Sequence, residues 1–257
     1  MRFYVKNKDN ERCLKLSERL IDILVNEGHT LDEYNPEFVF SIGGDGTFLK
    51  AVHAYLDKVP IFIGINEGNL GFLCEFVIDD FNIIKNIINE YQDNYKDYSL
   101  LGFEVNNETY YSLNEVRIES NDGSSLRFDI SVNDDFLERL NADGVCISSS
   151  IGSSGINKGL GGALVSHELE IMQLIEKTPI NNRCYSSINS PIIFNKDDII
   201  TIDNFAYNKF SIYYDNNSYN LDNFNGAIKI YISDRKIRVL KHPNVSFINK
   251  VNDAFIK

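Results

Sequence analysis

The first third of the chain alternates short apolar runs with stretches in which apolar residues recur at helical spacing. The runs at 3–5, 38–42 and 61–65 are apolar at nearly every position, which is typical of strands buried on both faces. After the first run, apolar residues recur at helical spacing at Cys13, Leu16, Leu20 and Leu24. The predicted helix ends at Gly28, a typical C-terminal residue. Further helices are predicted over about 47–56 and from Asp79 or Asp80. The last of these carries Ile83, Ile84, Ile87, Ile88 and Tyr91 on one side. This alternation predicts a parallel sheet covered by helices.

The pattern changes after about residue 97. Short segments rich in β-forming residues are separated by turn sequences and predict strands at 109–116, 127–132, 145–148, 199–205, 210–214, 227–233 and 237–240. One helix is predicted at 164–176, and the tail 246–256 is amphipathic. We therefore expect an α/β plus all-β fold. A Rossmann-like parallel α/β domain spans 1–96, an antiparallel β-sandwich domain spans 97–243, and the tail 244–257 packs back onto the first domain.

Composition and charge exclude several classes of partner. The 257 residues carry a net charge of −12 and an isoelectric point near 4.8, which argues against nucleic acid because phosphate contacts need basic patches. Such a protein must bind phosphates locally, with amides, a few cations and a divalent ion. No apolar stretch of about 18 residues is present, and the first residues form too short an apolar run for a signal peptide. We expect a cytoplasmic protein without a membrane partner.

The cysteines and histidines predict no structural metal site. The four histidines are scattered, and the four cysteines are too far apart for a zinc motif. Each cysteine lies in or beside an apolar run, so we expect reduced core residues at Cys13, Cys74, Cys146 and Cys184.

The loop Gly43-Gly44-Asp45-Gly46 joins the strand at 38–42 to the next helix. Ligands bind at this edge of an open α/β sheet, because loop amides and helix N-termini there point toward anionic groups. A carboxylate among these amides would repel a phosphate, so it needs a chemical role such as accepting a proton from a hydroxyl. The alternative is a glycine-rich turn in which Asp45 caps the helix.

Three further stretches are polar where a core element would be apolar. Asn114 and Glu115 are adjacent within a strand pattern. Either they form a pair that binds a ligand such as a ribose diol, or they lie on a solvent-exposed edge or end of a strand. The sequence 141–144 reads as a β-turn. The serine- and glycine-rich run 148–162 suits a loop around a polar ligand, with Lys158 as a phosphate partner, or an exposed flexible loop.

Together these motifs resemble the NAD kinases, and in particular the short bacterial members of that family. The matching elements occur in the family's order: 43–47, Gly64-Ile65-Asn66, 68–72, Asn114-Glu115, Asp143-Gly144, Gly161-Gly162, 180–183 and Ser190-Pro191. The resemblance spans about 38–216. A lipid kinase that shares the Gly-Gly-Asp-Gly loop and a non-catalytic NAD-binding sensor are the alternatives. The acidic charge opposes the first, and retention of Asp45 opposes the second.

The resemblance implies phosphorylation of the 2′-hydroxyl of the adenosine ribose of NAD, giving NADP. It implies Mg²⁺ as cofactor, ATP or polyphosphate as phosphoryl donor, and a homodimer or homotetramer. Asp45 matches the residue that accepts the hydroxyl proton. The ligand-contacting positions that it implies are Gly43, Gly44, Gly46, Phe72, Asn114, Glu115, Asn141, Asp143, Ile151, Ser154, Gly155, Ile156, Asn157, Lys158, Gly159, Thr178, Ile180 and Asn216.

The chain departs from the family pattern at two places. Ile156 stands where family members often carry a tyrosine, and Asn141 stands where short members carry a basic residue. The first change removes a ring that could stack on the ligand, a contribution of about 1 kcal/mol.

Overall fold

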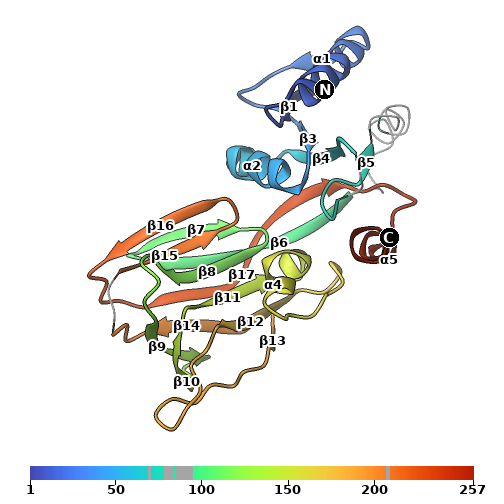
Figure 1. The fold of residues 1–257 in the computed structure, drawn as a ribbon. Helices are drawn as coiled ribbons and strands as arrows, with labels where there is room; N and C mark the ends of the chain where they lie inside the picture. Colours follow the sequence, from blue (N-terminus) through green and yellow to red (C-terminus); the bar gives the residue numbers. More distant parts are fainter. Residues whose placement is uncertain (69–70, 78–83, 85–94, 207–208) are drawn as a thin grey trace. The chain divides into compact units, whose positions relative to one another are not determined.

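The computed structural model describes the chain except for residues 69–70, 78–83, 85–94 and 207–208 (Figure 1). It divides into two compact units. The α/β unit comprises Met1–Tyr98 with Lys236–Lys257, and the β unit comprises Ser99–Arg235. Strands β6 (Tyr95–Val105) and β17 (Ile228–Leu240) run from one unit into the other. The helix predicted from residue 79 lies outside the described residues, apart from the buried Ile84.

A parallel sheet forms the centre of the α/β unit (Figure 1). Its strands lie in the order β2 (Thr30–Leu31), β1 (Arg2–Asn7), β3 (Phe38–Gly43) and β4 (Ile61–Asn66). The end of β17 and the short strand β5 (Phe76–Val77) both pair with β4 in parallel. Every residue of β3 is buried, as its continuous apolar run predicts.

Two of the three helices described in this unit begin at a side-chain cap. Helix α1 (Glu11–Asn26) begins where the Asn10 side chain accepts a hydrogen bond from the Cys13 amide at 2.8 Å, and it buries its apolar stripe in the core. Helix α2 (Asp45–Tyr55) begins directly after β3 and is followed by a 3₁₀ turn at Leu56–Lys58. Helix α5 (Phe247–Phe255) begins with a capping box between Ser246 and Asn249.

The β unit is a sandwich of two sheets, which share one hydrophobic core. One sheet is antiparallel, in the order β13 (Ile192–Asn195), β12 (Ile171–Lys177), β11 (Gly144–Ser149), β8 (Glu115–Ser120), β15 (Lys209–Tyr214) and β16 (Asn217–Asp222). The other has the order β10 (Asp135–Ala142), β9 (Leu126–Val132), β14 (Ile199–Asp203), β17, β6 and β7 (Glu108–Ser112). The predicted fold class, parallel α/β followed by an antiparallel sandwich, is confirmed.

Several local predictions were wrong. The helix expected at 164–176 is instead strand β12, which lies between β11 and β13. Residues 172–176 are all buried, including the polar Gln173 and Glu176, so the strand lacks the alternation of apolar and polar positions that would distinguish it from a helix. The segment expected as one strand at 109–116 is broken at 113–114 between β7 and β8, whereas the two strands expected at 227–240 are the single strand β17.

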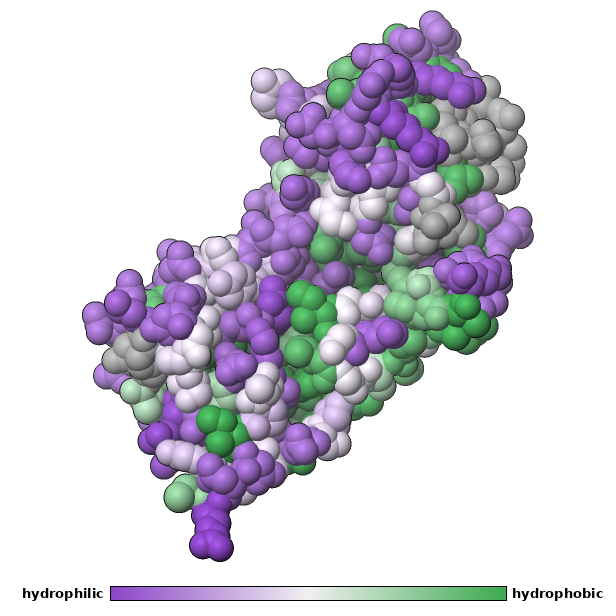
Figure 2. All heavy atoms as spheres, viewed as in Figure 1, coloured by the Kyte–Doolittle hydropathy of each residue, from purple (hydrophilic) through white to green (hydrophobic). Residues whose placement is uncertain are grey.

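The surface agrees with the acidic, polar composition. On the face shown in Figure 2, hydrophilic residues are spread over both units with smaller groups of apolar residues among them. None of the helices in the described part of the chain has the length and apolar character to cross a membrane. Cys13, Cys74 and Cys146 are free and buried as expected, but Cys184 is exposed, so the prediction of a core residue was wrong there.

Candidate functional site

The glycine loop of the α/β unit leaves open space beside its backbone. Gly43 has φ +152°, and a Cβ there would lie 2.6 Å from Thr47 Oγ1, so local packing requires this glycine. In contrast, a Cβ at Gly44 or Gly46 would meet no described atom within 4 Å. Packing therefore does not explain these two glycines. Their amides lie at the N-terminus of α2, where the helix dipole favours an anion.

Asp45 does not cap the helix that it begins. The N-cap is Gly44, and no side-chain hydrogen bond caps α2. The Asp45 carboxylate instead accepts three backbone hydrogen bonds from the segment 72–74. The Phe72 amide donates to Oδ2 at 3.0 Å, and the amides of Leu73 and Cys74 donate to Oδ1 at 3.0 and 3.2 Å.

This arrangement fixes the carboxylate while leaving it an accepting direction. Each carboxylate oxygen can accept about two hydrogen bonds. Of the three bonds from backbone amides, Oδ1 accepts two and Oδ2 accepts one, and the Cys74 thiol lies beside the same carboxylate. Gly71 is needed for the approach, because a Cβ there would lie 2.4 Å from Asp45 Oδ1. The structure therefore holds the half-buried Asp45 in one orientation with part of Oδ2 available.

The Phe72 side chain packs within the α/β unit. It is 8% exposed, and its ring centroid lies 6.4 Å from that of Phe247 and 5.7 Å from that of Phe255 on α5. The predicted contact of this ring with adenine stays a prediction, since α5 contacts the ring in this structure.

In the β unit, Asp215 fixes the turn that carries Asn114. Its carboxylate accepts hydrogen bonds from the amides of Leu113 and Asn114, each at 2.7 Å, and from Ser112 Oγ at 2.8 Å. Asp215 follows β15 and has φ 49°. The exposed Asn216 comes next in the chain, so the structure brings this predicted position close to the Asn114 turn.

The serine-rich segment closes on the same turn from the end of β11. The Ser149 amide donates to the Asn114 carbonyl at 2.8 Å, and Ser149 Oγ donates to the Leu113 carbonyl at 2.6 Å. A Cβ at Gly152 would lie 2.2 Å from the Asn114 carbonyl oxygen, so only glycine allows this close approach. The structure thus brings together Asn114, Glu115 and the start of the predicted ligand loop.

Two side chains of this cluster have unusual electrostatics. Asn114 Oδ1 is buried and has no hydrogen-bond partner among the described residues, and an unpaired buried acceptor costs about 1–3 kcal/mol. Glu115 is only 4% exposed. Burial raises its carboxyl pKa to about 7, and the neighbouring Asp215 adds to the rise while Arg117 opposes it. A ligand with hydrogen-bond donors would relieve both groups.

The remainder of the predicted loop is ordered as two short helical turns, at Ile151–Ser154 and Ile156–Gly159. Gly155, Ile156, Lys158 and Gly159 are exposed, and Ser154 is half-buried. Ile151 and Asn157 are buried. Asn157 Nδ2 donates to the carbonyls of Ser153 and Ala163, each at 3.3 Å, so this side chain holds the loop in place. We conclude that 148–162 is a folded segment of the β unit.

The other predicted positions form a second group at the opposite end of β11. The Ile180 amide donates to the Asn141 carbonyl at 2.8 Å, and the Asp143 amide donates to the Lys177 carbonyl at 3.0 Å, next to the exposed Thr178. In the register, Gly144 pairs with Glu119, whereas Ser148 pairs with Glu115. Asp143 and Glu115 are therefore separated by about five residues of strand, or roughly 17 Å.

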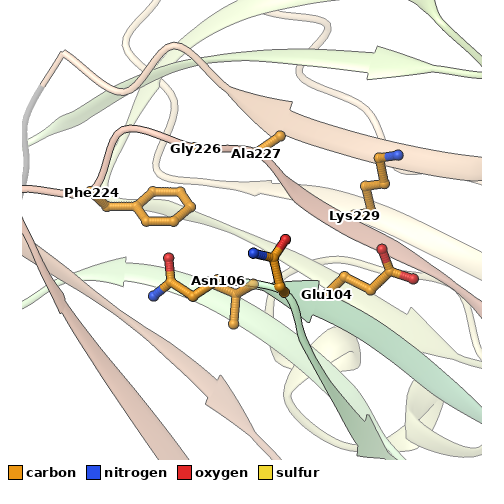
Figure 3. Close-up of a pocket in the computed structure, with 8 residues that line it drawn as sticks. Glu104, Asn106, Phe224, Gly226, Ala227 and Lys229 are labelled. Carbon is orange, nitrogen blue, oxygen red and sulfur yellow. The ribbon is translucent and has the colours of Figure 1, made fainter.

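The cavity drawn in Figure 3 is not part of these groups. It has a volume of about 370 Å³ and lies in the β unit, where Glu104 and Asn106 face Phe224 and Lys229. None of the predicted site residues lines it. Among the described residues, no three His, Cys, Asp or Glu side chains are placed to hold a metal ion.

Sequence reasoning missed the residues that hold the functional groups in place. Gly71 lies within the family motif at 68–72. A side chain is excluded there because it would collide with Asp45, which lies 26 positions earlier in the chain. Asp215 directly precedes the predicted position Asn216 but was not itself predicted. The one available signal was its position in a turn after a strand, where aspartate is common for many reasons.

Known proteins match the chain along its whole length. The model of the ATP-NAD kinase N-terminal domain matches residues 4–93, and that of the C-terminal domain matches residues 113–242. NAD kinase 1 of Oceanobacillus iheyensis is 32% identical over 264 residues, covering 100% of this chain and 98% of the relative. NAD kinase 1 of Listeria monocytogenes serotype 4b is 34% identical over 266 residues, covering 100% of both.

Two solved structures share the fold. An NAD kinase from Archaeoglobus fulgidus in complex with ATP has a TM-score of 0.82 at 21% identity, covering 98% of this chain and 99% of that one. Yeast NADH kinase complexed with NADH has a TM-score of 0.83 at 18% identity, covering 98% of this chain and 86% of that one.

Proposed function

The chain belongs to the NAD kinase family, and we propose that it transfers a phosphoryl group from ATP to the 2′-hydroxyl of the adenosine ribose of NAD, giving NADP. Both family domains match, and full-length relatives named as NAD kinases are 32% and 34% identical to it. It is a phosphotransferase that acts on an alcohol group.

The single observation that best supports a catalytic role is the hydrogen bonding of Asp45. Three backbone amides orient its carboxylate, and Oδ2 keeps an accepting direction for a substrate hydroxyl. Asp45 would accept the proton of the attacking 2′-hydroxyl. A carboxylate is a weak base at neutral pH, but phosphoryl transfer passes through a loose transition state, so the position of the hydroxyl matters more than the strength of the base.

The glycine loop would bind the phosphoryl donor. The backbone at Gly44 and Gly46 is open to an approaching phosphate, and the N-terminus of α2 favours its negative charge. Mg²⁺, when bound, neutralises charge on the phosphates as they react.

The Asn114 turn would bind the adenosine of NAD. The unpaired Asn114 Oδ1 can accept from an exocyclic amino group, and the buried Glu115 carboxylate can accept from ribose hydroxyls. Asn216 and the segment 151–159 would add contacts from the same cluster. Asn141, Asp143, Thr178 and Ile180 would contact another part of the ligand.

Three properties remain predictions from the family resemblance. These are a requirement for Mg²⁺, a dimeric or tetrameric assembly, and a cytoplasmic location. Polyphosphate is the alternative donor.

An assay of wild-type protein and Asp45→Asn tests the proposed function. Purified protein is given NAD, Mg²⁺ and either ATP or polyphosphate, and NADP is measured with an NADP-specific dehydrogenase. We expect wild type to form NADP. Asp45→Asn should reduce kcat by about 10²–10⁴-fold while calorimetry shows nearly unchanged NAD binding, because the change removes a proton acceptor and keeps its shape. Asp22→Asn, on the exposed side of α1, is the matched control.

Each alternative predicts a different result. NAD binding without NADP formation would indicate a sensor, whereas phosphorylation of diacylglycerol in vesicles without NADP formation would indicate a lipid kinase. If Asp45→Asn retains more than about a tenth of wild-type kcat, Asp45 has a structural role instead.

A further inference from the structure

A buried carboxylate of the α/β unit binds two lysines near the Asp45 loop. Glu75 is 2% exposed and follows the segment 72–74 that binds Asp45. Its carboxylate forms ion pairs with Lys241 and Lys250 and accepts a hydrogen bond from the His242 amide at 3.0 Å. Glu75 thus links the loop to the C-terminal part of the chain.

Of the two lysines, Lys250 also binds the backbone of the Asp45 loop. It lies on α5 and is 4% exposed, and its Nζ donates to the Phe72 carbonyl at 2.9 Å. Lys241 shares Glu75, and its Nζ lies 5.6 Å from the centre of the Tyr98 ring. Burial and the neighbouring Lys250 lower the pKa of Lys241 to about 6. Both lysines bind Glu75, but the bond to the Phe72 carbonyl comes from Lys250.

The Phe72 carbonyl belongs to the same peptide group as the Leu73 amide. That amide donates to Asp45 Oδ1 at 3.0 Å. A cation on the carbonyl side of a peptide group polarises the group and strengthens the hydrogen bond donated by its N–H. Lys250 and Asp45 are therefore joined through a single peptide group.

A lysine at this position carries a cost that a hydrophobic residue would not. Burial lowers the pKa of Lys250, whereas a hydrogen bond with Lys241 and, to a smaller extent, the Asp45 carboxylate act in the opposite direction. Replacing a buried ion pair by apolar side chains is often neutral or stabilising, so packing alone does not explain why α5 places an ammonium group here.

We propose that Lys250, held by Glu75, is a positioning residue for phosphoryl transfer: it binds the Phe72 carbonyl and so fixes the Leu73 amide that orients the Asp45 carboxylate. This inference rests on the proposed function of Asp45. It assigns to the C-terminal helix a part in the geometry of the reaction.

The test compares Lys250→Met with Lys241→Met. Each variant removes one lysine from Glu75, but only the first removes the contact with the Phe72 carbonyl. We expect Lys250→Met to lower kcat by about 10–100-fold with KM for NAD and ATP changed less than about threefold, because small misplacements of reacting groups act mainly on turnover. Lys241→Met should keep kcat within about threefold of wild type, and Lys250→Arg should recover part of the loss.

A double-mutant cycle with Asp45→Asn separates positioning from general destabilisation. If Lys250 acts through Asp45, Lys250→Met should have little further effect on kcat in the Asp45→Asn background. Equal losses in kcat for the two lysine variants, or a full additional loss in that background, would overturn the proposal. If Lys250→Met does not fold, Lys250→Gln is measured in the same cycle, and wild-type kcat in that variant would also overturn it. Absence of NADP formation by wild-type protein would instead refute the proposed function.

Discussion

Replacing Glu115 by glutamine should change how the stability of the protein depends on pH. The Glu115 carboxyl is buried, and its pKa is raised from 4.5 to about 7 by burial first and by Asp215 second. In the unfolded chain the same group has a pKa of about 4.3. Below this value both states are protonated, and the group does not affect the free energy of unfolding. As the pH rises from about 4.3 to 7, the carboxyl ionises in the unfolded chain while it stays largely protonated in the folded protein.

The sign and size of the effect follow from these pKa values. The free energy of unfolding should fall as the pH rises from about 4.3 to 7, and the cost is complete above pH 7. Since one pKa unit corresponds to about 1.4 kcal/mol, the cost is on the order of 4 kcal/mol. Glu115→Gln keeps the shape of the side chain and cannot ionise. The variant should therefore nearly match wild type at pH 4.5 and exceed its stability by up to about 4 kcal/mol at pH 8.

Urea unfolding at pH 4.5, 6 and 8 measures this difference, with Glu119→Gln as a matched control on the same strand. Burial acts to raise the Glu119 carboxyl pKa, but Lys177 and Arg117 outweigh it and hold the pKa below its ordinary value. Glu119→Gln should therefore destabilise the protein at pH 8 and have less effect as the pH falls. An offset between Glu115→Gln and wild type that does not change with pH would refute this reasoning, because it would mean that the Glu115 carboxyl ionises with an ordinary pKa.

Three further predictions concern the site residues. Glu115→Gln should raise KM for NAD more than it lowers kcat, since a group that binds ribose hydroxyls in both ground and transition states affects binding; steady-state kinetics showing unchanged KM with a collapse of kcat would contradict this. Gly71→Ala should lower kcat by at least about tenfold, because its Cβ would lie 2.4 Å from Asp45 Oδ1, and NAD titration should show binding retained. Ile156→Tyr, alone or with Gly155→Ala, should tighten NAD binding by roughly 0.5–1.5 kcal/mol by calorimetry. A Cβ at Gly155 meets the Gly152 carbonyl at an acceptable 3.4 Å, so unchanged affinity in both variants would show that position 156 does not face the ligand.

The sequence determined those features that depend on neighbouring residues. The apolar run of β3 predicts its continuous burial, and Asn10 predicts the start of α1. The glycine loop marks the junction between β3 and α2. The antiparallel half of the fold was predictable because β-forming segments alternate with turn sequences. Local preferences failed at β12, where burial on both faces removed the alternation that identifies a strand.

Only the tertiary structure decided how the functional groups are held. Asp45 binds amides 27 to 29 residues away, Asp215 binds the Asn114 turn across 101 to 103 residues, and Lys250 binds the Phe72 carbonyl across 178 residues. No periodicity or spacing along the chain encodes these contacts, because each depends on which strands and helices become neighbours when the two cores form. The sequence thus predicts Asp45 as a proton acceptor and the Asn114–Glu115 pair as a ligand-binding pair. Their orientation comes from distant residues, since a short carboxylate or amide side chain is fixed only by the donors and acceptors that folding brings to it.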